Sequence, residues 1–235
     1  MNVLYFNCQS GISGDMVVGS LLDLGIETEY LVRELSKLPL CGYSVSARKV
    51  DKLGVPATKF DVALEPDQPR RNLQDIRFII EKSGLAREVK RLSQDIFMNL
   101  AKSEALAHNT SIEKVHFHEV GCVDSIIDII SAAILLNKLS VDEIHCGTVS
   151  LGRGTIMTEH GMMEIPAPAV RNLLKDAPTD VTEIYAELTT PTGAAILRTC
   201  VKKYTNNPPE TGKIGYGAGT LDLGIPNVLQ ALINP

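Results

Sequence analysis

A chain of 235 residues, 44% hydrophobic and 22% charged, has the composition of a soluble globular protein and is long enough for a substantial core. Its net charge of −5 gives no electrostatic reason to expect nucleic acid or an anionic membrane as a partner. No run approaches the roughly 20 apolar residues of a membrane span, and the N-terminus lacks the pattern of a signal peptide. The five cysteines are scattered without a CxxC pair, which favours reduced thiols and a cytoplasmic location.

The N-terminal segment combines a strand, a turn and a helix. Residues 2–7 are typical of a buried strand, and a helical pattern begins at Asp15 and ends at Gly25. The turn and the start of the helix hold Ser10, Gly11, Ser13, Gly14 and Asp15. Backbone N–H groups and the helix dipole would point at one spot there, which is an anion-binding geometry. A tight turn capped by Ser13 or Asp15 explains the same residues equally well.

The next hundred residues alternate apolar patterns with turn signals. Two segments alternate strictly, as antiparallel strands do, and three have helical spacing. The predicted elements are a helix at 28–38, strands at 43–50 and 58–64, a polar loop at 65–72, and helices at 73–83 and 85–107. The last helix is followed by His108, one turn after Glu104. These two residues form either an exposed pair or part of a site with the histidines that follow.

Segment 116–133 places acids and histidines before and within an apolar helix. His116 and His118 are two residues apart, so their side chains leave an extended segment on the same side. Asp124 and Asp128 lie one helical turn apart, and burying both costs free energy unless a cation or hydrogen-bond donors lie between them. The pattern predicts a metal or acid/base site that also includes Glu119. Alternatively, the histidines bond backbone groups, Asp124 caps the helix and Asp128 faces water.

A histidine also occurs in a proline-containing segment further along the chain. Residues 142–149 predict a strand, after which a glycine-rich connection leads to His160. Pro166 and Pro168 exclude a central strand and favour an extended loop that enters a helix near Ala169. His160 becomes a further candidate metal ligand, although a lone loop histidine is more often ordinary.

A second candidate anion site begins at Thr190. Thr190 and Pro191 have the positions of an N-cap and a first helical residue. Thr192 and Gly193 follow, and hydroxyls with free N–H groups at a helix N-terminus suit a phosphate or carboxylate. A well-capped helix without a ligand explains these residues too.

The order of elements predicts an α+β (mixed α/β) fold. The C-terminal tail contains five glycines before a final apolar strand, so helices and strands follow one another along the whole chain. We expect a mixed sheet with a helical middle layer, in which residues 73–138 form a separate layer or subdomain.

Five motifs occur in the order seen in the LarC family of nickel insertion proteins, which the chain resembles over about residues 2–232. They are YFNCQSGISGDM, VHFHEVGCVDSIIDI, HGMMEIPAPAVRNLL, ELTTPTGAAIL and IGYGAGTLD. The resemblance implies a nickel-inserting cyclometallase, a metal chelatase of the lyase class. Its substrate would be pyridinium-3,5-bisthiocarboxylic acid mononucleotide, in which Ni(II) is placed between two sulfurs and a ring carbon in a CTP-dependent reaction. The product is the nickel-pincer cofactor of lactate racemase.

The chain departs from the family pattern in three places. The family usually carries a second, CTP-binding domain, and we expect residues 1–235 to be a single LarC-like N-terminal domain without it. In some members these parts are separate reading products joined by frameshifting, so the partner is expected as a C-terminal half or a separate chain. Segment 65–72 replaces a histidine-rich run, so nickel storage there is not expected. Asn7 stands where the family often has Asp, which removes one possible ligand.

The implied substrate needs an anion cradle and a metal-holding cluster. The turn at 10–15 or the helix start at 190–193 would take the phosphate. His116 and His118 are the first-choice Ni(II) ligands, because imidazole suits this ion. Glu119, Asp124 or Asp128 would complete the ligand set, or one of these carboxylates would accept the proton of the ring carbon.

Two functions from different classes remain open. In the first, the chain is the nickel- and substrate-binding half of an insertion enzyme and is incomplete alone. In the second, it is a non-catalytic metal-binding or scaffold module that delivers nickel or assembles an oligomer. A homo-oligomer is expected in either case, with neither nucleic acid nor membrane as partner.

Overall fold

The computed structural model describes residues 2–115, 117, 121–158, 161–210 and 212–234. Four residues of the predicted metal site, His116, His118, Glu119 and His160, lie outside this part of the chain. The predicted ligation by these residues therefore stays a prediction. The other candidate residues, among them Asp128, are all placed.

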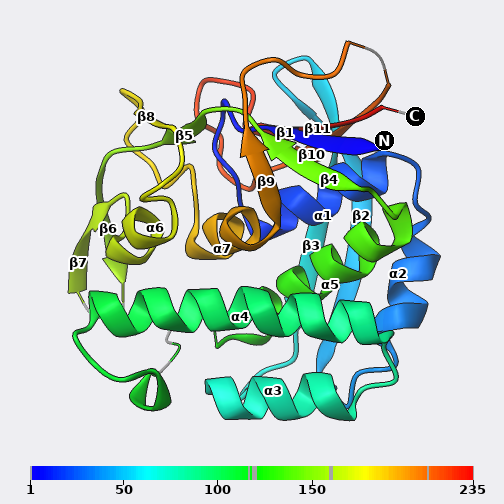
Figure 1. Cartoon of the computed structure of the whole chain (residues 1–235), viewed down its shortest axis with the longest axis vertical. Coiled ribbons are helices and arrows are strands. Elements are labelled where there is room, and N and C mark those ends of the chain that lie inside the picture. The colour runs from blue at the N-terminus through cyan, green and yellow to red at the C-terminus, as the bar shows by residue number, and fades with distance from the viewer. Residues whose placement is uncertain (1, 116, 118–120, 159–160, 211, 235) are drawn as a thin grey trace.

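A mixed sheet crosses the upper part of the molecule in Figure 1, and its β2–β3 end continues downwards on the right. Its order within the described residues is β2-β3-β10-β11-β1-β4-β9. The strands are β1 (Val3–Asn7), β2 (Tyr43–Lys52), β3 (Val55–Leu64), β4 (Glu143–Cys146), β9 (Val201–Tyr204), β10 (Lys213–Ala218) and β11 (Val228–Ile233). Strands β1, β4 and β9 run parallel, whereas β11 is antiparallel to both of its neighbours. The predicted mixed sheet is confirmed.

Helices lie in two layers below the sheet in Figure 1. Helices α1, α5 and α7 form the layer next to the sheet, and α4 packs beneath them with α3 beside it. The helices are α1 (Gly14–Asp23), α2 (Thr28–Leu35), α3 (Leu73–Lys82), α4 (Arg87–Ala107), α5 (Val123–Leu139), α6 (Pro168–Leu173) and α7 (Pro191–Cys200), with a short 3-10 helix at Ile112–Lys114. The predicted α+β class, with helices packed on a mixed sheet, is therefore confirmed, whereas a separate layer or subdomain at residues 73–138 stays a prediction.

Glycines let α1 lie directly on the sheet. A Cβ atom at Gly217 of β10 would collide with the backbone carbonyl of Met16, and one at Gly215 would collide with that of Ser20. On the helix side, a Cβ at Gly19 would collide with the carbonyl of Thr58 in β3. Two glycines of the tail, Gly215 and Gly217, are thus explained by close helix–sheet packing. This packing also places the N-terminus of α1.

The core runs without interruption from the sheet into the helical layers. It includes Phe6 of β1, Phe60 of β3, Phe97 of α4 and Ile127 of α5, all fully buried. The thiols of Cys8 and Cys146 lie in it with their Sγ atoms 3.5 Å apart, and the five cysteines are free, as predicted. Among the described residues, no helix is long and apolar enough to cross a membrane.

The segment before α6 corrects one prediction. Instead of an extended loop, Gly154–Thr158 (β6) and Gly161–Ile165 (β7) pair as an antiparallel ribbon outside the large sheet. Pro166 comes after the last residue of β7, so it removes no hydrogen bond from the ribbon. Pro168 then takes the first position of α6, as expected for proline at a helix start.

The predicted strand at 142–149 is also divided in two. It ends at Cys146, and Val149–Leu151 (β5) then pairs in parallel with Thr179–Val181 (β8), away from the large sheet. Strands β8, β9 and β10 are not predicted by the sequence pattern. Lysines in β9 and glycines in β10 interrupt the alternation of apolar and polar residues that predicts a strand. These strands are stabilised by packing against helices instead.

Candidate functional site

The two turns predicted to bind an anion lie side by side. Ile12 forms an isolated parallel bridge with Thr189. The Ile12 N–H donates to the Leu188 carbonyl over 3.0 Å, and the Thr190 N–H donates to the Ile12 carbonyl over 3.0 Å. A Cβ at Gly193 would collide with the Ile12 carbonyl, so this glycine permits the close approach. The N-termini of α1 and α7 are therefore held at one place in the fold.

Both turns line the same cavity, which has a volume of about 500 Å³. Ser13 and Asp15 come from the first turn and Thr190 from the second. The opposite walls come from the β6–β7 ribbon, the segment before α7 and the loop after β10. They include Thr155, Ile156, Ile165, Tyr185, Glu187, Thr220, Leu221, Asp222 and Asn227. The described lining residues carry three carboxylates and no basic side chain, so this wall favours a cationic group.

The N-terminus of α1 is already occupied by carboxyl groups of the protein. The Met16 N–H donates to Asp15 Oδ1 over 2.9 Å, and Ser13 Oγ donates to the same oxygen. The backbone N–H of Asp15 forms a hydrogen bond with the Asp128 carboxyl group. Asp15 and Asp128 thus use N–H groups that a phosphate would need, and anion binding at this turn stays a prediction.

Asp128 is a carboxyl group enclosed by the fold. Its side chain packs against Gly14, where a Cβ atom would come within 2.7 Å of its own Cβ. The residue as a whole is partly exposed, yet Oδ1 is closed to solvent and has no hydrogen-bond partner among the described residues. Burial raises the pKa of Asp128 well above its usual range, and repulsion from Asp15 and Asp124 raises it further. The alternative in which Asp128 faces water does not hold for Oδ1.

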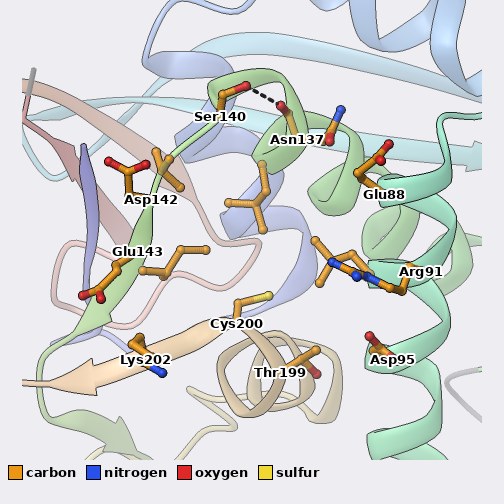
Figure 2. Close-up of a pocket in the computed structure, with 14 residues that line it drawn as sticks. Glu88, Arg91, Asp95, Asn137, Ser140, Asp142, Glu143, Thr199, Cys200 and Lys202 are labelled. Atoms are coloured by element: carbon orange, nitrogen blue, oxygen red, sulfur yellow. Dashed lines mark hydrogen bonds between the residues drawn. The ribbon is translucent and has the colours of Figure 1, made fainter. Parts of the chain in front are cut away.

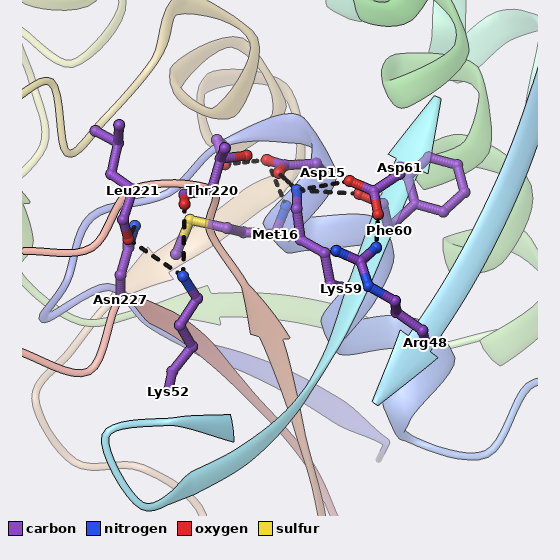
Figure 3. Close-up of polar contacts among 11 residues, drawn as sticks. Asp15, Met16, Arg48, Lys52, Lys59, Phe60, Asp61, Thr220, Leu221 and Asn227 are labelled. Atoms are coloured by element: carbon purple, nitrogen blue, oxygen red, sulfur yellow. Dashed lines mark hydrogen bonds and ion pairs between the residues drawn. The ribbon is translucent and has the colours of Figure 1, made fainter. Parts of the chain in front are cut away.

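Lys59 supplies the nearby positive charge, and sequence analysis did not single it out. It is 7% exposed, and Figure 3 shows its ammonium group directed from β3 towards Asp15 and Asp61. It forms an ion pair with Asp15, a second at 3.6 Å with Asp61, and a 3.1 Å hydrogen bond with the Phe60 carbonyl. Arg48 pairs with Asp61 from the surface side. The buried ammonium holds the Asp15 carboxylate on the cavity wall.

The N-terminus of α7 differs in that hydroxyl groups cap it. Thr190 Oγ1 accepts the Gly193 N–H over 3.3 Å, which confirms its predicted role as N-cap. Thr190 Oγ1 also lies 2.8 Å from Thr192 Oγ1. Thr190 borders the cavity, whereas Thr192 and Gly193 are buried behind it. Of the two turns, this one keeps a neutral hydroxyl and the positive end of a helix dipole at the cavity.

Ser10 and Gly11 serve the backbone framework. Ser10 Oγ donates to the Pro226 carbonyl over 2.7 Å, which ties the loop after β10 to the turn. Gly11 has φ +80°, and a Cβ there would collide with the Leu188 carbonyl. Neither residue lines the cavity. Ser10 and Gly11 would therefore not contact a ligand in the cavity directly. They would affect it only through the loop that Ser10 holds.

Asp124 and the Glu104–His108 pair lie apart from the cavity lining. Asp124 is exposed in the first turn of α5, where its Oδ1 accepts the Ser125 N–H over 2.7 Å. His108 Nε2 lies 3.6 Å from Glu104 Oε2. Among the placed residues there is no group of three or more side chains that could hold a metal ion. The predicted nickel site depends on residues outside the described part of the chain, so it stays a prediction.

A larger cavity, of about 840 Å³, lies between α4, the end of α5 and strands β4 and β9. Figure 2 shows Glu88, Arg91 and Asp95 on α4, opposite Glu143 and Lys202. None of the sequence-predicted site residues lines it. Its charged side chains are of both signs, and no convergence of motifs supports a ligand there.

Comparison with known proteins adds an independent observation. A family described as nickel insertion protein matches residues 4–235. A pyridinium-3,5-bisthiocarboxylic acid mononucleotide nickel insertion protein from Geobacillus kaustophilus is 44% identical over 245 residues, which cover 99% of this chain and 60% of that protein. A protein of the same name from Clostridium kluyveri is 42% identical over 247 residues, covering 99% and 62%. The chain thus spans about three fifths of the length of these relatives. No solved structure matches it.

Proposed function

The chain belongs to the nickel insertion protein family, and from this premise we propose that it is the nickel- and substrate-binding half of a CTP-dependent insertion reaction. The substrate would be pyridinium-3,5-bisthiocarboxylic acid mononucleotide, the compound in the names of its relatives. The observation that carries the proposal is the convergence of Ser13, Asp15 and Thr190 on one cavity. Two motifs far apart in the sequence meet there.

The cavity offers a different environment for each part of this substrate. The pyridinium ring and Ni(II) are cationic and suit the wall that carries Asp15, Glu187 and Asp222. The phosphate suits the N-terminus of α7 beside Thr190, because the N–H groups of α1 are taken by carboxyl groups of the protein. This division favours the second of the two predicted anion sites.

Nickel insertion must also remove a proton from the ring. The ring carbon exchanges its bond to hydrogen for a bond to nickel, and the released proton needs an acceptor. Asp15 is the carboxylate on the cavity wall, held there by Ser13 and Lys59. We assign it the role of acceptor in preference to Asp124 or Asp128, because neither of these residues lines the cavity. Nickel would be held by His116, His118, Glu119 and His160.

The decisive experiment is a nickel transfer assay. The purified 235-residue chain is incubated with Ni(II), CTP and the ligand precursor, with and without the remaining part of a full-length relative as a separate chain. We expect nickel-pincer product only in the complete mixture. Product from the 235-residue chain alone would contradict the half-enzyme proposal, and nickel binding without product in both mixtures would favour a delivery module.

The metal ligands are tested separately by calorimetric titration with Ni(II). The unmodified chain should show one strong site, and a His116→Ala/His118→Ala double variant should lose it, because imidazole is the preferred ligand. A His145→Ala variant is the matched control, since His145 pairs with Glu143 on β4 and was not predicted to belong to the site. Unchanged affinity in the double variant would contradict the ligand assignment.

A further inference from the structure

Tyr185 has an unusual position for an aromatic side chain. It lines the cavity that Asp15 and Thr190 border, yet it is 77% exposed. Most of its ring area is therefore available at the mouth of the cavity. A single exposed aromatic residue is common on protein surfaces, so exposure alone assigns no role to it. The contacts that hold the ring are the informative feature.

The ring is held in place by residues 153 and 154. The Arg153 guanidinium carbon lies 5.3 Å from the ring centroid, within the range of a cation–π contact. Arg153 is itself fixed by a 3.2 Å hydrogen bond from Nε to the Thr182 carbonyl and by an ion pair with Glu183. Because Glu183 balances its charge, Arg153 supports the ring without making the site strongly positive.

Gly154 supplies the room for this arrangement. Its φ of +103° lies in the region that favours glycine, and a Cβ there would come within 3.2 Å of Tyr185 Cδ1. The backbone at residue 154 can therefore approach the ring closely. The ring is positioned before any ligand arrives, which lowers the entropy cost of stacking on it.

The chemistry of the walls indicates which ligand ring would stack there. Asp15, Glu187 and Asp222 make the cavity acidic, and Ile156 and Leu221 add apolar surface. A planar ring with a positive charge satisfies both features, since the face of a phenol ring attracts cations. A neutral or anionic ring would lose the electrostatic part of this attraction.

We propose that Tyr185 is the specificity-determining residue on which the pyridinium ring of the mononucleotide substrate stacks. The inference rests on the proposed function and deepens it, because it names the side chain that selects a cationic ring. The Tyr185 ring contacts one face of the pyridinium ring at the mouth of the cavity. The ribose phosphate then extends towards the N-terminus of α7.

The test measures binding of nicotinic acid mononucleotide, a pyridinium mononucleotide, to the full chain by calorimetry. Tyr185→Ala should weaken binding about tenfold, the usual scale for losing one aromatic stacking partner. Tyr185→Phe should bind within about threefold of the unmodified chain, because it keeps the ring. The chain has no tryptophan, so a charge-transfer absorbance band on binding would report tyrosine alone, and Tyr185→Ala should abolish it.

Phe78→Ala is the matched control. Phe78 is 60% exposed on α3 and has Lys82 Nζ 5.7 Å from its ring centroid, but it does not line the cavity. Its removal should leave binding unchanged. Thermal unfolding of each variant checks that the fold is retained.

Equal affinity of Tyr185→Ala and the unmodified chain would overturn the inference, and so would a loss of the same size in Phe78→Ala. Failure of the unmodified chain to bind the probe would overturn it as well. Nickel insertion itself would then still be decided by the transfer assay with the natural precursor. The two proposals can therefore fail independently.

Discussion

The helices α1 and α7 begin at the same cavity, but different groups cap them. At α1, carboxyl groups of Asp15 and Asp128 accept backbone N–H groups of the first turn. At α7, the Thr190 hydroxyl is the cap, with the Thr192 hydroxyl beside it. Both turns have the residue types of an anion site. A helix N-terminus thus attracts an anion in either case, and tertiary contacts decide whether the protein supplies that anion itself.

The difference has an electrostatic consequence for the cavity. The acidic end at α1 needs a buried cation, and Lys59 provides it from a strand of the sheet. The end at α7 needs none, because a hydroxyl cap carries no charge. The charged groups at the N-terminus of α1 therefore belong to the protein itself, whereas a negative charge at the N-terminus of α7 would come from a ligand.

The largest expected effect is that of Lys59→Met, which removes the buried cation while keeping an unbranched apolar side chain one atom shorter. The variant should lose about 3–5 kcal/mol of unfolding free energy, because a buried ion pair broken on one side leaves an uncompensated charge on Asp15. Urea denaturation at neutral pH measures it. Lys52→Met is the control: its partner Asp222 has a side chain that is 93% exposed, so the loss should stay within about 1 kcal/mol. Equal losses would contradict the special role of the α1 end.

A second test concerns the pH dependence of Asp128. Burial and the neighbouring carboxylates raise its pKa, so the folded state binds this proton more tightly than the unfolded state. Its contribution to stability is present at low pH and is lost as pH rises above about 4 and through the raised pKa. Asp128→Asn should therefore stabilise the protein by about 1–2 kcal/mol at pH 7, with little change near pH 3.

Asp124→Asn provides the comparison for Asp128. Asp124 is exposed on the same helix, one turn earlier, and its charge contributes to the raised pKa of Asp128. Its substitution should change the unfolding free energy by less than about 0.5 kcal/mol. If Asp128→Asn destabilised the protein at pH 7 more than at pH 3, the buried carboxyl would be ionised and paired, contrary to the structure.

The smallest expected effect separates the two caps directly. Thr190→Ala should cost about 1 kcal/mol, since it removes the hydroxyl that accepts the Gly193 N–H. Thr190→Ser should restore most of that loss. Ser13→Ala should cost less than Thr190→Ala, because Ser13 makes no side-chain cap bond to α1. Thermal unfolding of the three variants at pH 7 gives the order, and a larger effect at Ser13 would reverse the distinction between the helices.

Local patterns in the sequence determined most of the framework. The apolar run before Asn7, the alternation of the strands β2 and β3, and the Thr190–Pro191 helix start all act through neighbours along the chain, so their periodicity and capping predict them correctly. The ribbon at 154–165 was missed because prolines argue only against central strands. Strand β10 was missed because its glycines serve contact with α1, which no local pattern reveals.

Tertiary structure alone decided how the candidate site is composed. The sequence identified Ser13, Asp15 and Thr190 but could not show that they share a cavity, since 175 positions separate Asp15 from Thr190 in the chain. It also contained Lys59 and Tyr185 without marking either, because a lysine in a strand and a tyrosine in a loop are ordinary until their neighbours are known. Chemistry that depends on residue type and close spacing can be read from sequence. Burial, ion pairing and the occupant of a helix N-terminus depend on segments that only folding brings together.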